Sequence, residues 1–289
     1  MSDATERSKN GLVLEGGAMR ALFTAGVLDA MMEEHLRFDG IVGVSAGAAF
    51  GCNYKSGQIG RVLRYNLRFC RDPRYCGWRS WLRTGDLFGA DFCYHELPET
   101  LDPFDGLAFA KDPTEFHLVC TDVTTGEACY HRCDRADVAC FEWMRASASM
   151  PLVSRIVEVD GGRYLDGAIA DAVPLRFFEE QGYAKNVVIL TRPAGYVKAA
   201  SSAMPLLKIA YRRYPALLRR LAERHLRYNE AVRYAEAQAA AGSVLLIRPP
   251  EPLPIDRVTH DRDLIERTYA AGRAEAARRM PELRDFLAR

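Results

Sequence analysis

The sequence lacks any large excess of charge of one sign. Lys and Arg together number 39 and Asp and Glu 38, which leaves a formal net charge of +1 at pH 7. Nucleic-acid binding depends on a strongly basic surface, so this balance excludes nucleic acid as a general partner. Any charged partner must therefore meet a local patch.

Long hydrophobic runs are also missing, and no secretory signal is visible, so we expect none. No apolar stretch approaches the roughly 20 residues that a membrane-spanning helix needs. The opening MSDATERSKN is polar and lacks the basic segment followed by an apolar segment that is typical of a signal peptide. With 48% hydrophobic residues the chain can bury a full core, and we expect a cytoplasmic globular protein.

Cysteine pairs with metal-binding spacing are absent. The eight cysteines include no Cys-x-x-Cys, and in a reducing compartment they are expected to be buried free thiols. The nearest approach to a metal site is CYHRC, in which Cys129, His131 and Cys133 would share one face of a strand. A fourth ligand is not evident, so the sequence predicts no metal and no other cofactor.

The sequence does contain a series of short apolar segments that alternate with helical patterns. These segments are rich in Val, Ile and Leu, as buried strands of a largely parallel sheet are. The alternation indicates an α/β fold. The predicted strands are 11–14, 40–44, 116–120, 186–190 and 243–247, and the predicted crossover helices are 19–34, 46–55 and 174–181.

Two further segments are typical of antiparallel hairpins, so the central sheet is predicted to be mostly parallel but mixed. Residues 117–132 contain a turn at Thr125 and Gly126, and residues 154–168 contain a turn around Gly161.

The composition shifts after Pro193 toward Arg, Tyr and Ala. We therefore predict a main domain over 10–193 and an α-rich C-terminal extension over 194–289. In the extension, a long helical region is followed by one more strand, a Pro-rich link and two terminal helices.

The segment GVSAG, residues 43–47, lies between a predicted strand and a predicted helix. In a Gly-x-Ser-x-Gly turn the chain reverses tightly around the serine, and flanking glycines remove side chains that would collide. Gly43 and Gly47 occupy those positions, and the Ser45 hydroxyl is predicted to stand exposed above the sheet. The alternative is a small-residue turn that only packs a helix against a strand. The local context favours a nucleophile elbow.

A second glycine turn, LEGGAMRA, follows the first predicted strand. A serine that attacks an ester carbonyl leaves negative charge on the oxygen, which fixed backbone N–H groups stabilise. Gly16, Gly17 and Ala18 lack bulk, so the backbone can approach a ligand closely, and we predict an oxyanion hole here. The competing interpretation is a dinucleotide-binding loop, but the G-x-G-x-x-G spacing is absent.

Three motifs, GGAMR, GVSAG and LDGAIAD, together resemble the signatures of the patatin-like phospholipases. The resemblance implies an αβα sandwich that hydrolyses acyl esters of lipids. It also implies a Ser-Asp dyad, here Ser45 and Asp166, with Gly167 and Ala168 completing an Asp-Gly-Ala motif.

The resemblance covers about residues 11–190 and departs from the family pattern in the oxyanion turn. Glu15 stands where patatin has Asp, and Ala18 and Ala21 replace glycines. Small residues are kept, so we expect an oxyanion hole of altered width. Arg20 matches the Arg of the signature; bracing the turn is favoured over contact with a lipid phosphate.

Three other residues compete with Asp166 for the role of base. Asp166 follows a hairpin strand, and its alternative role is an Asx turn that only closes a loop. Asp171 is expected to be an N-cap or turn residue ahead of Pro174. A triad of the α/β-hydrolase order would need a later histidine, which leaves His225 and His260. Both are expected at the surface, so the dyad is favoured.

The segment from Lys208 to Arg227 carries a local excess of basic residues above an apolar stripe at helical spacing. One interpretation is peripheral contact with an anionic membrane. The other is a helix packed on the core with solvated arginines. The second is favoured, because Pro215 interrupts the helix and the stripe is narrow.

The motifs predict a metal-independent serine acyl hydrolase that acts on lipid or phospholipid esters. The alternative from another class is a catalytically idle protein of the same fold that binds lipid or serves as a scaffold. A thioesterase or peptidase with the same dyad would differ only in its pocket.

Overall fold

The computed structural model describes residues 8–288, and most of the polar opening segment, residues 1–7, lies outside that range. The strands are β1 (Lys9–Leu14), β2 (Gly40–Val44), β3 (Glu115–Asp122), β4 (Ala128–Arg132), β5 (Val157–Val159), β6 (Gly162–Asp166), β7 (Tyr183–Ile189) and β8 (Val244–Ile247). The α-helices are α1 (Leu22–Glu33), α2 (Ala46–Lys55), α3 (Arg61–Phe69), α4 (Trp78–Thr84), α5 (Gly106–Lys111), α6 (Val138–Ser147), α7 (Leu175–Glu180), α8 (Met204–Ala210), α9 (Pro215–Ala241) and α10 (Arg262–Ala288). Two 3-10 turns, η1 (Ala18–Ala21) and η3 (Gly167–Ile169), and a π-helix, η2 (Phe92–Leu101), complete the fold.

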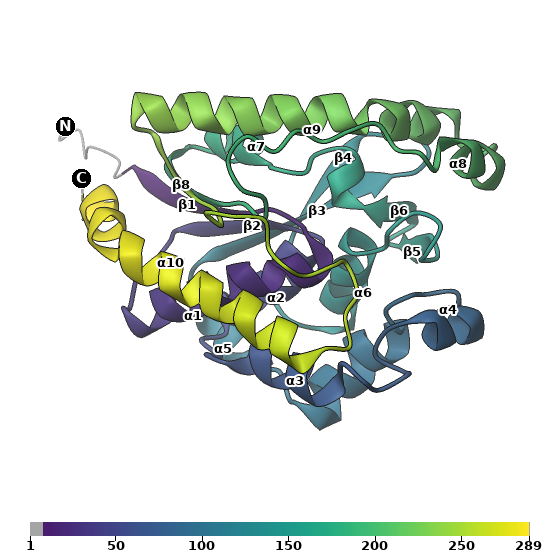
Figure 1. The fold of residues 1–289 in the computed structure, drawn as a ribbon, viewed down its shortest axis with the longest axis horizontal. Coiled ribbons are helices and arrows are strands. Elements are labelled where there is room, and N and C mark those ends of the chain that lie inside the picture. Colours follow the sequence, from purple (N-terminus) through teal and green to yellow (C-terminus); the bar gives the residue numbers. More distant parts are fainter. Residues whose placement is uncertain (1–7, 289) are drawn as a thin grey trace, which may run out of the picture.

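All strands join one sheet in the order β5-β6-β3-β2-β1-β7-β8, with β4 also paired to β3. Helices cover both faces, with α7 and α9 on one side and α1, α2 and α10 on the other (Figure 1). The predicted α/β class and αβα layering are confirmed.

The five apolar segments form strands, as predicted, and they pair in parallel. The pairs are β1 with β2, β1 with β7, β2 with β3, and β7 with β8. The two predicted hairpins are also present, because β3 pairs antiparallel with β4 and β5 pairs antiparallel with β6. The sheet is therefore mixed, and its parallel part is buried on both faces.

The C-terminal helices differ from the prediction in one respect. A single helix, α10, replaces the two terminal helices and continues through Pro281. Buried side chains near both ends, Ile265 and Leu283, hold it along its whole length against the core. Gly272 and Gly26 allow this packing, since a Cβ on either would collide with a backbone carbonyl of the facing helix.

Four helices between β2 and β3, α3, α4, η2 and α5, have no counterpart in the predicted elements. Pro98 lies inside η2 and α4 is seven residues long, so neither has a clear apolar period. The helix α3 does have one, with Val62, Tyr65 and Phe69 buried at helical spacing, and the prediction missed it. These helices matter for function, because α3 and η2 form one wall of the cavity described below.

The cysteines are free thiols, as predicted, and six of the eight are buried. The strand predicted to carry Cys129 and His131 is β4. The His131 ring stacks on Trp143, with 4.2 Å between the ring centroids. Within residues 8–288 no three His, Cys, Asp or Glu side chains converge as a metal site would require. Over the same residues no helix is long and apolar enough to cross a membrane.

Candidate active site

Ser45 lies at the turn between β2 and α2 in a strained backbone conformation, with φ of 55° and ψ of −125°. Non-glycine residues avoid positive φ, and such strain is typical of functional turns. Neighbouring glycines make the turn fit. A Cβ on Gly43 would lie 2.5 Å from the Cα of Ala48, and one on Gly47 would lie 2.5 Å from the Leu14 oxygen.

A residue that the sequence analysis missed supports the serine. The Ser45 N–H donates to Ser147 Oγ at 2.9 Å, and the Ser147 hydroxyl donates to the Val119 carbonyl at 2.6 Å. Ser147 lies 102 residues away on α6, so no local motif indicates it. The Ser45 side chain is not exposed as predicted: only 6% of it is accessible, because it faces a cavity.

The glycine turn after β1 lies directly against the serine. A Cβ on Gly16 would be 2.9 Å from the Ser45 Cβ, so only glycine allows this approach. Ala18 has a positive φ of 48°. Within residues 8–288, the N–H groups of Gly16, Gly17 and Ala18 have no hydrogen-bond acceptor. They are therefore available to a ligand beside Ser45.

Asp166 ends β6 and pairs in register with Cys120 of β3, which brings it to the same edge of the sheet. Its Oδ1 accepts a hydrogen bond from the Ala168 N–H at 2.8 Å. Burial raises the pKa of the Asp166 carboxyl, and the charge of Arg224, the Ala168 N–H and the nearby Ser45 side chain oppose that rise. The structure thus brings Ser45 and Asp166 together.

Two of the competing residues are engaged elsewhere, and the buried Nδ1 of the third, His225, has no hydrogen-bond partner within residues 8–288. Asp171 accepts from the Tyr130 hydroxyl at 2.8 Å and from the Val173 N–H at 3.2 Å, so its carboxylate caps the turn before α7. The His260 ring contacts the Cys70 carbonyl. No hydrogen bond joins His260 or His225 to the dyad residues in the described part of the chain.

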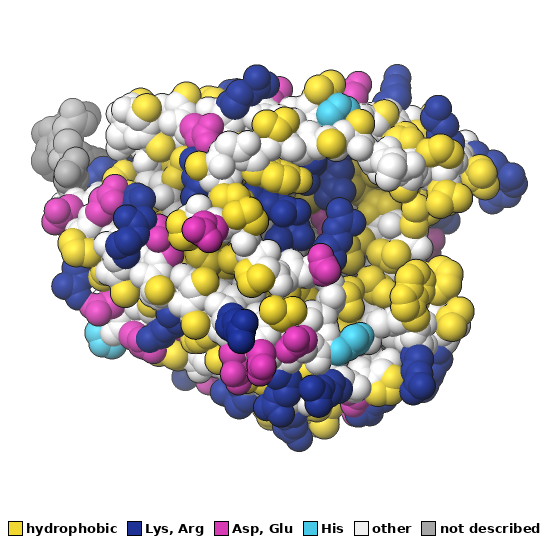
Figure 2. Space-filling view, in the orientation of Figure 1, with side chains coloured by type: hydrophobic (Ala, Val, Ile, Leu, Met, Phe, Trp, Pro, Cys, Tyr) yellow, Lys and Arg dark blue, Asp and Glu magenta, His cyan; other side chains and the backbone are white. Residues whose placement is uncertain are grey.

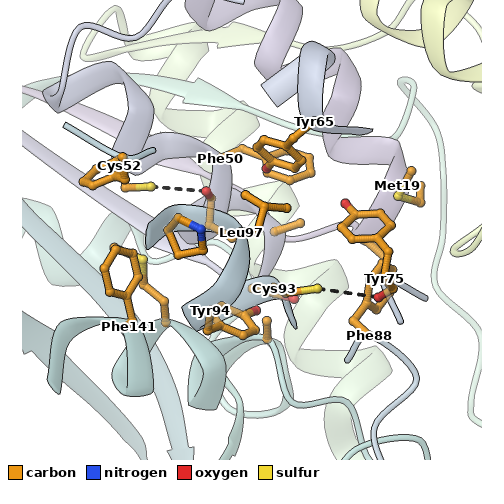
Figure 3. A pocket seen from close by; sticks show the side chains of 18 of the residues that line it. Met19, Phe50, Cys52, Tyr65, Tyr75, Phe88, Cys93, Tyr94, Leu97 and Phe141 are labelled. Atoms are coloured by element: carbon orange, nitrogen blue, oxygen red, sulfur yellow. Dashed lines mark hydrogen bonds between the residues drawn. The ribbon is translucent and has the colours of Figure 1, made fainter. Parts of the chain in front are cut away.

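An apolar cavity of about 110 Å³ opens beside the serine. Figure 3 shows side chains from α2, α3, η2 and α6 pointing into it, among them Phe50, Tyr65, Leu97 and Phe141. Ser45 and Ala18 lie on its lining, so the elbow and the oxyanion turn both border the apolar space. An apolar and aromatic lining of this kind suits a hydrocarbon chain.

Comparison with known proteins agrees with these motifs. The family model described as "Patatin-like phospholipase" matches residues 12–178. The chain belongs to the patatin-like phospholipase family. A second model, described as a domain of unknown function (DUF6363), matches residues 214–288.

Among relatives of this patatin-like chain is "Uncharacterized protein YjjU" of Escherichia coli K12, 32% identical over 63% of this chain and 52% of that protein. Another is "Uncharacterized NTE family protein Rv1063c" of Mycobacterium tuberculosis, 28% identical over 57% of this chain and 44% of that protein. The chain thus spans about half the length of the curated relatives it matches. The VipD structure from Legionella pneumophila aligns with a TM-score of 0.47 and 11% identity, over 94% of this chain and 66% of that one.

The patatin-like core is tied to the C-terminal region at Glu15. Its carboxylate is buried, accepts from the Thr191 N–H at 2.5 Å and accepts from the Tyr228 hydroxyl of α9 at 2.8 Å. These contacts connect the start of the oxyanion turn to both β7 and α9. Glu15, which stands where patatin has Asp, is therefore held by hydrogen bonds from Thr191 and Tyr228 of this chain.

The basic segment 208–227 is divided between two helices, with a break after Ala210 and a new start at Pro215. Its apolar stripe faces inward, because Leu217 and Leu221 are buried. The core-packed interpretation therefore holds for α9. Two arginines of the segment also bind backbone carbonyls of the patatin-like core.

Proposed function

We propose that this protein is a serine acyl hydrolase that cleaves acyl esters of lipids, with Ser45 as nucleophile and Asp166 as general base. The observation that carries the proposal is the strained Ser45 in contact with a buried carboxylate whose pKa is raised. A raised pKa makes a carboxylate a better base near neutral pH, which a two-residue dyad requires.

The geometry supports the following reaction. Asp166 accepts the Ser45 hydroxyl proton as the oxygen attacks the ester carbonyl, and the free N–H groups of Gly16 to Ala18 stabilise the resulting oxyanion. The proton then passes to the leaving alcohol, and an acyl-serine ester remains. Water, activated by the same carboxylate, hydrolyses that ester and regenerates Ser45.

The substrate class rests on the cavity. Aromatic and aliphatic side chains line the space beside Ser45, and a fatty acyl chain gains about 0.8 kcal/mol per methylene buried there. A lipid or phospholipid ester fits this chemistry. A thioester or peptide with a long apolar group would enter the same cavity, so a panel of acyl substrates is needed to rank them.

Peripheral contact with an anionic membrane is proposed for α8, which carries the start of segment 208–227 and the residues just before it. On α8, Leu206 and Ile209 are 61% and 69% exposed, and Lys208 lies between them. Exposed apolar side chains flanked by basic ones are typical of interfacial helices.

The catalytic assignment is tested with a fluorophosphonate probe and a soluble acyl ester. Ser45→Ala is expected to lose labelling, and Ser45→Ala and Asp166→Asn are expected to lose hydrolysis by at least about a thousandfold, since each removes a partner in the chemical step. Asp171→Asn and His260→Ala are the matched controls and retain most of both.

The second candidate function, an idle lipid-binding or scaffold protein, predicts a different result. Wild-type protein that binds lipid but neither reacts with the probe nor hydrolyses any ester would decide for it. Loss of activity in His260→Ala with intact folding would instead replace the dyad by a triad.

A further inference from the structure

Five cationic side chains lie near one another, close to the dyad and the oxyanion turn. We call them the basic cluster. Arg20 interacts electrostatically with Arg192 and Arg257, and Lys198 interacts with Arg20, Arg192 and Arg224. Figure 2 shows Lys and Arg side chains gathered in a recess below α9, next to an apolar hollow. The cluster consists of Arg20, Arg192, Lys198, Arg224 and Arg257.

The basic cluster has no anionic partner of its own. Within residues 8–288, none of its members forms an ion pair with a carboxylate. The two nearby carboxylates, Glu15 and Asp166, already accept hydrogen bonds from other groups. Arg20 Nε is buried without any hydrogen-bond partner. Buried polar groups are normally satisfied, so this donor is available to an acceptor on a ligand.

The cations are nevertheless held in defined positions. The Lys198 ammonium lies 4.1 Å from the centroid of the Tyr228 ring, and both backbone polar groups of Lys198 bond to the Asn229 side chain. The Arg192 guanidinium lies 4.5 Å from the Tyr196 ring. Aromatic faces thus hold the cluster in place without neutralising it.

Two members also connect the cluster to the reacting atoms. Arg224 donates to the Ala168 carbonyl at 2.9 Å, two residues after the dyad aspartate. The Arg257 carbonyl accepts from the Met19 N–H, next to the oxyanion turn. The cluster therefore borders the place where the ester carbonyl reacts.

Bringing these cations together lowers the stability of the folded protein, because they repel one another and are partly buried. Burial and the neighbouring arginines lower the pKa of Arg20, and burial lowers the pKa of Lys198 to about 8. Glu15 offsets these shifts only in part. Partly buried groups with shifted pKa values cluster at functional sites.

We propose that the basic cluster binds a phosphate group carried by the acyl ester substrate, an inference that rests on the hydrolase function proposed above. Arginine guanidinium groups match phosphate oxygens in paired hydrogen bonds, and several cations suit a dianionic phosphomonoester. The acyl chain then occupies the apolar cavity, the ester lies at Ser45, and the phosphate lies between the oxyanion turn and α9.

Direct binding tests the cluster without any need for turnover. Ser45→Ala protein is titrated calorimetrically with three probes below their micelle concentrations: inorganic phosphate, dihexanoyl phosphatidic acid, and dihexanoylglycerol, which lacks the phosphate. The phosphatidic acid is expected to bind about 10- to 100-fold more tightly than the diacylglycerol. Inorganic phosphate is expected to compete with the phosphatidic acid and not with the diacylglycerol.

The double substitution Arg192→Gln/Lys198→Gln in the same background removes this phosphate-dependent gain. Arg233→Gln is the matched control, since Arg233 is an exposed α9 arginine without an ion pair in the described range, and it leaves the gain intact. The double variant is also expected to melt at a higher temperature, because repulsion is relieved, and to lose the stabilisation that inorganic phosphate gives the parent.

Three results overturn the proposal: equal affinity for phosphatidic acid and diacylglycerol, a gain that survives the double substitution, or tight binding of inorganic phosphate alone, which would mark a free-phosphate site. Failure of the Ser45-bearing protein to hydrolyse either ester counts against the hydrolase function and not against the cluster. The two ideas thus fail in different experiments.

Discussion

At the scale of single residues, the site depends on how Asp166 is surrounded. Burial raises the pKa of its carboxyl, and the positive charge of Arg224 is first among the influences that lower it. A carboxylate that acts as base must be ionised, so activity falls as the pH drops through its pKa. The raised pKa places the acid limb of the activity profile above the ordinary range of an aspartate.

Arg224→Gln is therefore expected to move the acid limb of kcat/KM for a neutral soluble ester to higher pH. Removing the positive charge takes away an influence that favours the ionised carboxylate, so the pKa of Asp166 rises further. The measurement is kcat/KM from pH 4 to pH 9 under conditions in which the variant stays folded.

Two controls separate charge from structure in that experiment. Arg224→Lys keeps the charge and should return the profile toward that of the parent. Arg220→Gln, one turn earlier on α9, loses a similar bond to the Gly126 carbonyl and should leave the profile in place. Equal displacement by Arg220→Gln would show that the effect is structural.

Site residues that lie within one short motif could be predicted from the sequence, and those that reach the site from distant elements could not. The positions of Ser45 and the glycine turn were predictable, because a strand, a tight turn and a helix are all encoded within a few residues. Ser147 and Arg224 were not, since they reach the site from α6 and α9 through tertiary packing. Arg20 was expected to brace its turn, but its side chain makes no hydrogen bond within residues 8–288.

At the scale of elements, the buried strands were predictable and the cavity wall was not. The strands are short, apolar and bounded by turn residues, so composition alone indicates them. The π-helix η2 contains Pro98 and has no regular period, yet it supplies part of the cavity. Helices of this kind are stabilised by what they pack against, and the sequence does not reveal that.

The apolar stripe of segment 208–227 was predicted correctly, but a stripe at helical spacing does not indicate whether it packs against the protein core or a membrane. The stripe on α9 packs inward, so we assign the proposed membrane contact to α8, where Leu206 and Ile209 are exposed. We expect the double substitution Leu206→Asp/Ile209→Asp to reduce flotation with anionic phosphatidylglycerol vesicles severalfold, because it replaces exposed apolar side chains with acidic ones.

Leu107→Asp is the control for that measurement, since Leu107 is 75% exposed but lies on α5. Binding should also weaken as salt is raised. Equal flotation with neutral phosphatidylcholine vesicles, or an equal loss in Leu107→Asp, would rule out α8 as the docking helix.

At the scale of the whole molecule, the predicted boundary at residue 193 divides a shared sheet. β8 comes from the C-terminal region and pairs with β7, while α9 and α10 cover opposite faces. The same region supplies Tyr228 to Glu15 and Arg224 to the site. The composition does change after residue 193, but the residues on both sides of that position contribute to the same sheet and the same core.

A fragment of residues 1–193 is therefore expected not to fold. Four fully buried C-terminal side chains, Leu217, Ile247, Ile265 and Leu283, each stabilise the folded state by about 1.5–3 kcal/mol. Their combined loss is comparable with the roughly 5–15 kcal/mol by which such domains are stable. The fragment should be insoluble or lack a cooperative thermal transition in near-ultraviolet circular dichroism, whereas the full chain should unfold in one transition. A soluble fragment that melts cooperatively and reacts with a fluorophosphonate at Ser45 would establish 10–193 as an independent domain, and the contacts from α9 would then serve regulation or specificity instead of folding.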